Sequence, residues 1–317
     1  MASPTRHLGL DLGATNLKWV VVERADARGG EGAGGDSTEG SWRTLDRDQV
    51  LTLAQEGPDA VVERLASIGR SAKQRWPGIG SIGIGVPGLY DPVGGRTRFL
   101  VNTPGDWADR PVAGPVAEAL DLPAVLINDA RAFGLAELRL GAGRGARAMV
   151  GLTLGTGVGG VLAIDGRVVQ GHDGTAGEVG HQTIDPDGPW CGCGNRGCLE
   201  AFARADQIAL ACGTATAEAA VDAARAGDPR ALAGLAEIGR YLGIGVANMI
   251  VVISPDRIVI GGGVAAAGDL LLEPIRHELR RRVRTTSLDR VELVTAELGI
   301  WAGAIGAAVH GAEQAAL

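Results

Sequence analysis

Alternating apolar residues mark two similar hairpins, one near the start of the chain and one near its middle. Leucines alternate with other residues over 8–12, a short turn follows at 13–15, and a second apolar run covers 19–22. Residues 148–164 repeat this arrangement around a Gly-rich turn. Strict alternation is typical of strands and glycine is typical of tight turns, so each segment predicts strand, turn, strand.

A constant offset of 142 residues relates the two hairpins. The matched pairs are Gly9 with Gly151, Leu10 with Leu152, Leu12 with Leu154 and Gly13 with Gly155, whereas Asp11 matches Thr153. Any two Gly-turn hairpins share some features. Matching alternation at the opening of each half of the chain nevertheless favours a duplicated domain.

The remaining segments alternate between helix and strand patterns. Apolar periodicity predicts a helix at 57–75, and composition predicts helices at 130–140, through most of the Ala-rich segment 201–250 and in the small-residue segment 300–317. Strands are predicted at 81–88 and just before Asn128. Residues 257–282 predict a strand, a Gly turn and a helix. Residues 25–48 are rich in Gly, Asp, Ser and Arg without an apolar period, which predicts a long exposed loop. Strands and helices alternate in both halves, so the fold class is α/β.

Composition excludes several classes of protein. The 317 residues suit about two domains, and 51 glycines without a collagen period indicate many close backbone approaches. A net charge of −7 argues against binding nucleic acid through its phosphates, though not against one local basic patch. The N-terminus lacks the pattern of a signal peptide, and the most apolar stretch, Tyr241–Ile253, is too short for a bilayer span. We therefore expect a cytoplasmic protein with no membrane segment and no nucleic-acid partner.

One histidine and three cysteines lie at H-x9-C-x-C-x4-C spacing, in His181, Cys191, Cys193 and Cys198. One imidazole and three thiolates form a closed tetrahedral set that suits Zn²⁺, and a closed set leaves no position for a reactive water. Incidental thiols beside a surface histidine are the alternative, which the clustering of three of the four cysteines disfavours. The spacing predicts a structural zinc site, and the fourth cysteine, Cys212, is expected in the core.

Two carboxylates, Glu178 and Glu200, flank these predicted metal ligands. Solvated surface charge is the simplest interpretation of such residues. A metal that fixes the loop would instead hold both rigidly, and a rigid carboxylate pair can accept hydrogen bonds from sugar hydroxyls.

The Gly turns at 13–15 and 155–157 are typical of phosphate cradles, because successive backbone N–H groups can face an anion there. Asp11, beside the first turn, could hold a metal ion or its waters near phosphates. Residues 83–88 and 155–160 both fit G-x-G-x-x-G, but one contains a proline and the other continues into a strand. Neither has the context of a dinucleotide site, and the sequence contains no P-loop motif.

Asn128 and Asp129 lie where a predicted strand ends and a helix begins. Both residue types are common helix N-caps, which is one interpretation. An aspartate at the carboxyl end of a strand, in a chain with two phosphate-type turns, is also a candidate catalytic base.

Five segments, in chain order, resemble the ROK family of repressors, uncharacterised frames and sugar kinases. They are DLGATNLK, INDA, LGTGVGG, the stretch from GEVGH to CGCGNRGCLE, and IVIGGG. The resemblance covers about residues 7–310 and implies the actin-like fold, a duplicated pair of ribonuclease-H-like α/β domains with a cleft between them. It places 1–127 and a C-terminal helix at about 301–317 in a small domain, and 128–300 in a larger domain with the zinc loop.

The resemblance implies ATP-dependent phosphorylation of a hexose at its 6-hydroxyl, with glucose as the expected sugar, Mg²⁺ with ATP, and a homodimer or dimer of dimers. Kinases for N-acetylmannosamine, N-acetylglucosamine, fructose or mannose remain open, as does polyphosphate as donor. A sugar-binding transcriptional regulator is a further alternative. Regulators of the family carry an N-terminal helix-turn-helix domain, for which the residues before Gly9 leave no room.

The resemblance also implies a role for each matched residue. Asp129 would orient the sugar hydroxyl and accept its proton. Sugar hydroxyls would be held by Asn102, Asn128, Asp129, Glu178, His181 and Glu200, with His181 also a metal ligand. ATP phosphates would face Asp11, Gly13, Ala14, Thr15, Asn16, Gly155, Thr156 and Gly157, and adenosine would lie by Gly261, Gly262 and Gly263. Arg131 departs from the family, since INDAR replaces the more frequent INDAN.

Overall fold

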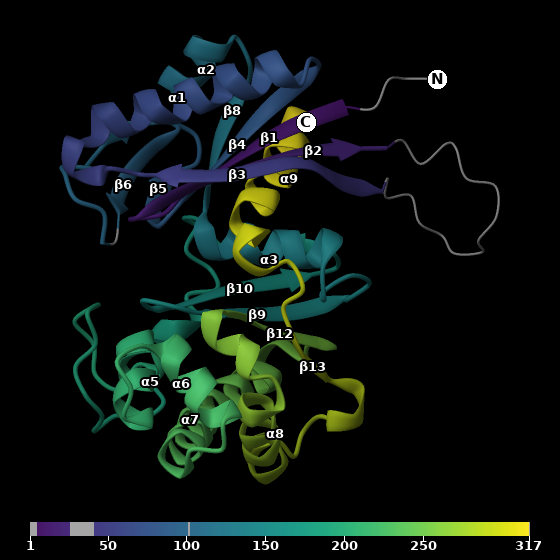
Figure 1. The fold of residues 1–317 in the computed structure, drawn as a ribbon. Coiled ribbons are helices and arrows are strands. Elements are labelled where there is room, and N and C mark those ends of the chain that lie inside the picture. The colour runs from purple at the N-terminus through teal and green to yellow at the C-terminus, as the bar shows by residue number, and fades with distance from the viewer. Residues whose placement is uncertain (1–4, 26–40, 101, 317) are drawn as a thin grey trace. The chain divides into compact units, whose positions relative to one another are not determined.

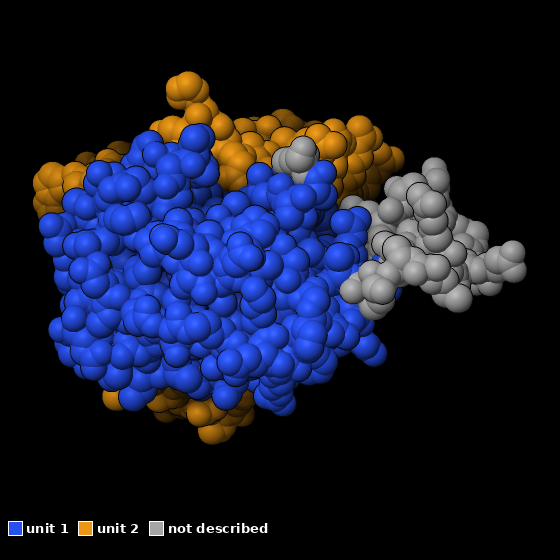
Figure 2. Space-filling view, turned by 90° about the horizontal axis from the view of Figure 1, so that it is seen from above, with its two compact units in different colours: residues 1–139, 301–317 blue, residues 140–300 orange. Residues whose placement is uncertain are grey.

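A computed structural model of the chain describes residues 5–25, 41–100 and 102–316. Its contacts divide the chain into two compact units (Figures 1 and 2). Unit 1 contains Met1–Arg139 and Trp301–Leu317, and unit 2 contains Leu140–Ile300. The last helix of the chain therefore returns to the first unit.

Unit 1 is built on a mixed five-stranded sheet in the order β3-β2-β1-β4-β8. Strands β1, β4 and β8 are parallel, whereas β2 and β3 are antiparallel to their neighbours. The strands are β1 (Thr5–Leu12), β2 (Asn16–Arg24), β3 (Trp42–Leu51), β4 (Ile79–Val86) and β8 (Ala124–Asn128).

The two faces of this sheet carry different residues because successive strand residues point to opposite sides. Leu8 and Leu10 on β1 are buried with residues of α1 (Pro58–Arg75) and α2 (Ala113–Leu120). Gly9 and Gly83 face α9 (Ala302–Ala315), where a Cβ on either would overlap a backbone carbonyl. Glycine on the sheet and small residues on α9 thus allow backbone-to-backbone packing (Figure 1).

One further helix and a second, smaller sheet belong to unit 1. Helix α3 (Asp129–Leu140) packs against α9 closely enough that a Cβ on Gly306 would overlap the backbone of Ala132. A three-stranded sheet, which the sequence pattern does not predict, joins β5 (Gly88–Asp91), β6 (Arg96–Leu100) and β7 (Arg110–Pro111). Its strands are too short for a period to be read.

Unit 2 repeats the sheet of unit 1, with the order β11-β10-β9-β12-β13. Again a hairpin with a three-residue turn, here β9 and β10, lies beside parallel strands. This shared order agrees with the 142-residue offset between the hairpins. The strands are β9 (Ala148–Leu154), β10 (Val158–Ile164), β11 (Arg167–Val168), β12 (Arg257–Gly262) and β13 (Glu292–Thr295).

The helices of unit 2 pack around its longest helix, α7. They are α4 (Leu199–Ala203), α5 (Ala205–Cys212), α6 (Ala217–Arg225), α7 (Pro229–Ile253) and α8 (Asp269–Arg282). Short 3₁₀ helices cover Ala54–Glu56, Val179–His181, Gly263–Ala267, Leu288–Arg290 and Gly299–Trp301.

Among the described helices, α7 alone has the length and apolar composition of a membrane span. It begins twelve residues before the apolar stretch seen in the sequence, after an Asp228 N-cap that accepts a hydrogen bond from Ala231 N–H at 2.8 Å. Leu235, Leu242 and Val246 are fully buried in the core of unit 2. The face of α7 that carries these residues therefore packs against the protein's own core.

Two expectations need correction. The predicted loop at 25–48 overlaps β3, and its residues 26–40 lie outside the described residues. β3 lacks an apolar period because it is an edge strand, paired on one side with β2 and mostly solvated, where charged side chains are tolerated. The contacts also divide the chain after Arg139 rather than after residue 127, because α3 packs on α9.

Candidate active site

The first Gly turn, at residues 13–15, is fixed by hydrogen bonds at both ends. Gly13 N–H donates to the Asn16 carbonyl at 3.1 Å, and a Cβ on Gly13 would lie 2.7 Å from that oxygen. Thr52 is fully buried; its N–H donates to Thr15 O at 2.9 Å and its hydroxyl to Gly13 O at 2.6 Å. These hydrogen bonds hold the backbone of the turn in place. Because Ala14 and Thr15 are exposed at its tip, the backbone there is open to a ligand.

Asp11 is separated from this turn by Leu12, the last residue of β1, and is largely buried. Its carboxylate is 3.4 Å from Lys18 Nζ, its antiparallel partner on β2. On the α9 side, a Cβ on Gly303 would lie 2.8 Å from Asp11 Cγ, so a larger residue there would displace the carboxylate or the start of α9. Burial raises the pKa of Asp11, and the Lys18 ammonium opposes that effect. The charged form of a buried carboxylate is stabilised by a cation beside it.

Asn128 ends β8 and caps α3. Its Oδ1 accepts hydrogen bonds from the N–H groups of Ala130 and Arg131 at 3.1 and 3.2 Å, and its Nδ2 donates to Gly88 O at 3.2 Å. The cap interpretation is thus correct for Asn128. Asp129 follows it at the first position of α3, half-buried, with Oδ1 accepting from Ala130 N–H at 2.8 Å.

Asp11 and Asp129 belong to the same edge of the unit 1 sheet. Asp11 pairs with Gly85 of β4, and Val86 of β4 pairs with Asn128. β1 and β8 are two strand spacings apart, roughly 10 Å. The carboxyl ends of parallel strands are where open α/β sheets bind ligands. Asn102 is not part of this edge; it is exposed between β6 and β7, with φ of 55°.

The second Gly turn, at residues 155–157, lies beside the predicted adenosine segment. Gly155 N–H donates to Gly157 O at 2.9 Å. Gly262 pairs with Leu154 across β12 and β9, has φ of 88°, and would overlap the Leu154 carbonyl if it carried a Cβ. The structure therefore brings Gly261–Gly263 next to the turn at 155–157, at one edge of the unit 2 sheet.

The four predicted zinc ligands converge in unit 2. One ligand atom from each of His181, Cys191, Cys193 and Cys198 lies within 4.8 Å of all the others. The Cys193 and Cys198 sulfurs are 3.7 Å apart, as are Cys191 Sγ and His181 Nδ1. Zn–S bonds of about 2.3 Å at tetrahedral angles require S–S separations of about 3.8 Å. The donor set and its spacing therefore fit a tetrahedral metal ion.

The loop that carries the thiols is held by its own backbone. Cys191 N–H donates to Asn195 O at 2.8 Å, and Gly197 N–H donates to Pro189 O at 2.8 Å. Burial raises the pKa of the Cys191 thiol to about 12 and raises that of Cys198, whereas the Asn195 N–H lowers that of Cys193. Since a bound metal ion deprotonates its thiol ligands, a cation would replace this burial effect with strong stabilisation of the thiolates.

Glu200 joins this metal cluster to the second Gly turn. Its Oε2 accepts a hydrogen bond from Val158 N–H at 2.9 Å, and its Oε1 accepts from the Cys191 thiol at 3.6 Å. A Cβ on Gly157 would overlap Oε2, so glycine there makes room for the carboxylate. Glu178 is exposed and precedes the 3₁₀ turn that carries His181, whose N–H donates to Glu178 O at 3.0 Å.

Three residues around Asp11 and the first turn were missed from the sequence. Lys18 follows from the hairpin register once the three-residue turn is fixed, so its signal was present. Thr52 and Gly303 are 37 or more residues away from the groups they contact, and no local pattern connects them. Their roles depend on tertiary packing alone.

Comparison with known proteins supports the resemblance seen in the sequence. The ROK family profile matches residues 29–313. The glucokinase of Thermotoga maritima is 36% identical over an alignment of 327 positions, gaps included. The alignment covers 95% of this chain and 95% of that protein.

Two solved structures share the fold closely. The ROK hexokinase of Thermus thermophilus has a TM-score of 0.79 and 34% identity, covering 98% of this chain and 99% of that one. A ROK family glucokinase from Streptomyces griseus, in complex with glucose and AMPPNP, has a TM-score of 0.78 and 29% identity, covering 98% and 100%. The expected two-domain, actin-like α/β fold is confirmed.

Proposed function

The chain belongs to the ROK family, and we propose that it is an ATP-dependent kinase that phosphorylates glucose at its 6-hydroxyl. The observation that carries the proposal is the edge of the unit 1 sheet. There Asp129 follows a buried cap residue, and Asp11 and the first Gly turn share the same edge. The glucokinase and hexokinase relatives, matched over nearly the whole chain, support the reaction and the sugar.

Asp129 is assigned the role of base. An unperturbed aspartate has a pKa of about 4 and is a weak base toward an alcohol, so its first task is to orient the sugar hydroxyl. The hydroxyl oxygen bonds to the γ-phosphorus as the bond from phosphorus to the bridging oxygen breaks and ADP leaves. The hydroxyl proton passes late in this step to the Asp129 carboxylate. The Asn128 cap fixes the start of α3, and the Ala130 N–H there donates to Asp129 Oδ1 at 2.8 Å, which orients the carboxylate.

The two Gly turns are assigned to ATP. Their rigid backbones can present N–H groups to phosphates, and Gly261–Gly263 beside the second turn would contact the adenosine. Mg²⁺ carried by ATP supplies neutralisation of the phosphate charge. Asp11 would hold the waters of that cation, because its buried carboxylate gains most from a nearby positive charge.

A zinc ion is proposed in the cluster of His181, Cys191, Cys193 and Cys198, with a structural role. Four protein ligands leave no position for a reacting water. The ion would hold the loop that presents His181 and Glu200 to the sugar. Glu200 already accepts a hydrogen bond from the backbone that leaves the second turn, which supports a rigid carboxylate able to accept hydrogen bonds from hydroxyls.

The sugar is the part of the proposal that most needs a test, because epimers differ by only a few hydrogen bonds. The experiment measures ADP release from Mg·ATP with glucose, mannose, fructose, N-acetylmannosamine and N-acetylglucosamine. We expect the highest kcat/KM with glucose. A higher value for another sugar would change the substrate and keep the reaction. No turnover with any of them would contradict the kinase assignment, and polyphosphate in place of ATP tests the donor.

Two expectations from the sequence analysis remain predictions. One is a cytoplasmic location, where ATP and free hexose are both available. The other is a homodimer or dimer of dimers, which sedimentation of the purified protein would test.

A further inference from the structure

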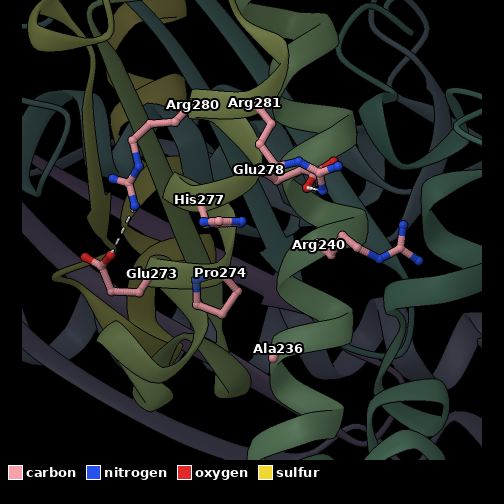
Figure 3. Close-up of a pocket in the computed structure, with 8 residues that line it drawn as sticks. All are labelled: Ala236, Arg240, Glu273, Pro274, His277, Glu278, Arg280 and Arg281. Carbon is pink, nitrogen blue, oxygen red and sulfur yellow. Dashed lines mark hydrogen bonds and ion pairs between the residues drawn. The ribbon is translucent and has the colours of Figure 1, made fainter.

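A second concave site, outside the residues assigned above, lies between α7 and α8 in unit 2. It is a cavity of about 550 Å³, a size typical of sites for small molecules. Its charged or titratable lining residues are Arg240 on α7, and Glu273, His277, Glu278, Arg280 and Arg281 on α8 (Figure 3).

Close packing of the two helices forms the floor of this cavity. A Cβ on Gly239 would lie 2.5 Å from Pro274 Cβ, and one on Gly243 would lie 2.6 Å from Glu278 Cβ. Glycines one turn apart on α7 thus let α8 approach. The same approach buries Glu278, which is only 1% exposed.

Both carboxylates of the lining are already neutralised by arginines. Glu278 bonds to Arg281 at 3.1 Å and also to Arg282, which lies outside the lining. Glu273 bonds at 2.6 Å to Arg276, another arginine outside the lining. Asp269 also bonds to Arg276. These three carboxylates are outnumbered by five arginines, so positive charge remains in excess around the cavity; the arginines are Arg240, Arg276, Arg280, Arg281 and Arg282.

The guanidinium groups of the lining keep donors available for a ligand. The Arg280 side chain is 59% exposed, and its Nη2 comes no closer than 3.7 Å to Glu273 Oε2. The Arg281 side chain is 63% exposed. Arg240 forms no salt bridge within the part of the chain that the structure describes; its guanidinium lies 4.4 Å from the Tyr241 ring centre. In Figure 3, His277 lies between the Arg280–Glu273 and Arg281–Glu278 pairs.

The charge of this region contrasts with that of the chain. Residues 269–284 contain five arginines and three carboxylates, whereas the whole chain carries −7. Arginines in the last turn of a helix also stabilise its dipole, which accounts for part of this cluster on α8. It does not account for Arg240, which lies in the middle of α7 and lines the same cavity.

We propose that the α7–α8 cavity binds a small anion that bears two or more phosphate groups. Planar guanidinium forks bind phosphate oxygens in pairs, and three arginines at separate points of one lining suit an anion with more than one phosphate. The cavity is of small-molecule size and the surrounding chain is acidic, which favours a compact anion over a nucleic acid.

The same residues connect this cavity to the sugar side of unit 2, a consequence that rests on the proposed function. The Tyr241 ring, which the Arg240 guanidinium covers, stacks on Phe202 with 4.4 Å between ring centres. Phe202 lies on α4, two residues after Glu200. An anion that draws Arg240 away from Tyr241 would therefore alter the packing of α4, and with it the affinity for glucose.

The test is calorimetric titration of the full-length protein with inorganic pyrophosphate at low salt. We expect binding to wild type, and a loss of at least about tenfold in affinity in Arg240→Gln/Arg280→Gln, which removes charge-assisted hydrogen bonds without touching Glu278. Arg284→Gln, an exposed arginine beyond the lining, is the control and should bind as wild type. Equal melting temperatures establish that the variants fold.

Two results would overturn the site. One is an absence of pyrophosphate binding to wild type, and the other is an unchanged isotherm in the double variant, which would mean binding elsewhere, such as at the Gly turns. Glucose titrated with and without pyrophosphate tests the connection, with Tyr241→Leu expected to abolish any difference. A protein that binds pyrophosphate in the cavity but fails to bind glucose would contradict the proposed function and leave the anion site standing.

Discussion

Glu200 accepts a hydrogen bond from the backbone N–H of Val158 at 2.9 Å. This bond ties the first turn of α4, which follows the last thiol of the cluster, to the strand that leaves the second Gly turn. The segment proposed for zinc and the turn proposed for ATP are therefore one rigid piece. A displacement of either segment is expected to displace the other.

Gly157→Ala tests this connection. A Cβ there would overlap Glu200 Oε2, so the carboxylate must move, and we expect the KM for glucose to rise at least about tenfold. Gly155→Ala is the matched variant, because a Cβ at that position meets no protein atom within 4 Å. It should leave the KM for glucose unchanged and raise that for ATP, if phosphates approach the turn. Unaltered glucose kinetics in Gly157→Ala would contradict the assignment of Glu200 to the sugar site.

Gly303→Ala tests the role of Asp11. The added Cβ would lie 2.8 Å from Asp11 Cγ and must displace the carboxylate or the start of α9. We expect kcat/KM for Mg·ATP to fall at least about tenfold, because a displaced carboxylate can no longer position the hydrated cation. Gly114→Ala, on α2 where a Cβ meets nothing within 4 Å, is the control and should keep wild-type activity. Equal activity in both variants would contradict the assignment.

Removal of zinc is expected to lower stability and glucose affinity together. Cys193→Ser changes the exposed thiol of the cluster, so it removes a ligand with little effect on core packing. We expect less than one equivalent of bound zinc and a melting temperature lower by at least about 4 °C, equivalent to about 2 kcal/mol. Cys212→Ser, in the core and outside the cluster, should retain zinc. A zinc-free variant with native melting and native glucose affinity would exclude the structural role.

Stability is expected to fall as the pH drops from about 6.5 to about 4. Burial lowers the pKa of both His7 and His310 from 6.5 to about 4. Between these values the unfolded chain binds protons at both residues and the folded chain does not, so acid favours unfolding. Above pH 6.5 neither state binds them and the effect ends.

Urea unfolding at a series of pH values measures this dependence. His310→Gln should reduce the slope of unfolding free energy against pH between 4 and 6.5, with His172→Gln, an exposed histidine, as control. An identical slope in His310→Gln and wild type would assign the acid sensitivity to other groups.

The sequence reveals those parts of the molecule that depend on local pattern. Both hairpins follow from alternating residues and Gly turns, and the convergence of His181 with the three thiols follows from ligand spacing. The α/β class follows from the order of strands and helices. The hairpins and the ligand cluster are each encoded in one short segment, and the class is encoded in the order of such segments.

Features that depend on distant contacts were not predictable in this way. β3 is a strand because β2 offers its edge, not because its own charged sequence favours one. The glycines that face α9 carry no periodic signal, and Gly303 meets Asp11 only because the last helix returns to unit 1. The predicted domain boundary, after residue 127, precedes the observed one, after Arg139, for the same reason. Helix α3 belongs to unit 1 because it packs against α9.

The most direct test of the central claim is Asp129→Asn, studied by ADP release and by calorimetric titration with glucose. The amide keeps the shape of the side chain and cannot accept the hydroxyl proton. We predict that kcat falls at least about 10²-fold while glucose affinity stays close to that of wild type. Asp121→Asn, at an exposed left-handed C-cap that either residue type can occupy, is the control. Wild-type turnover in Asp129→Asn would contradict the account.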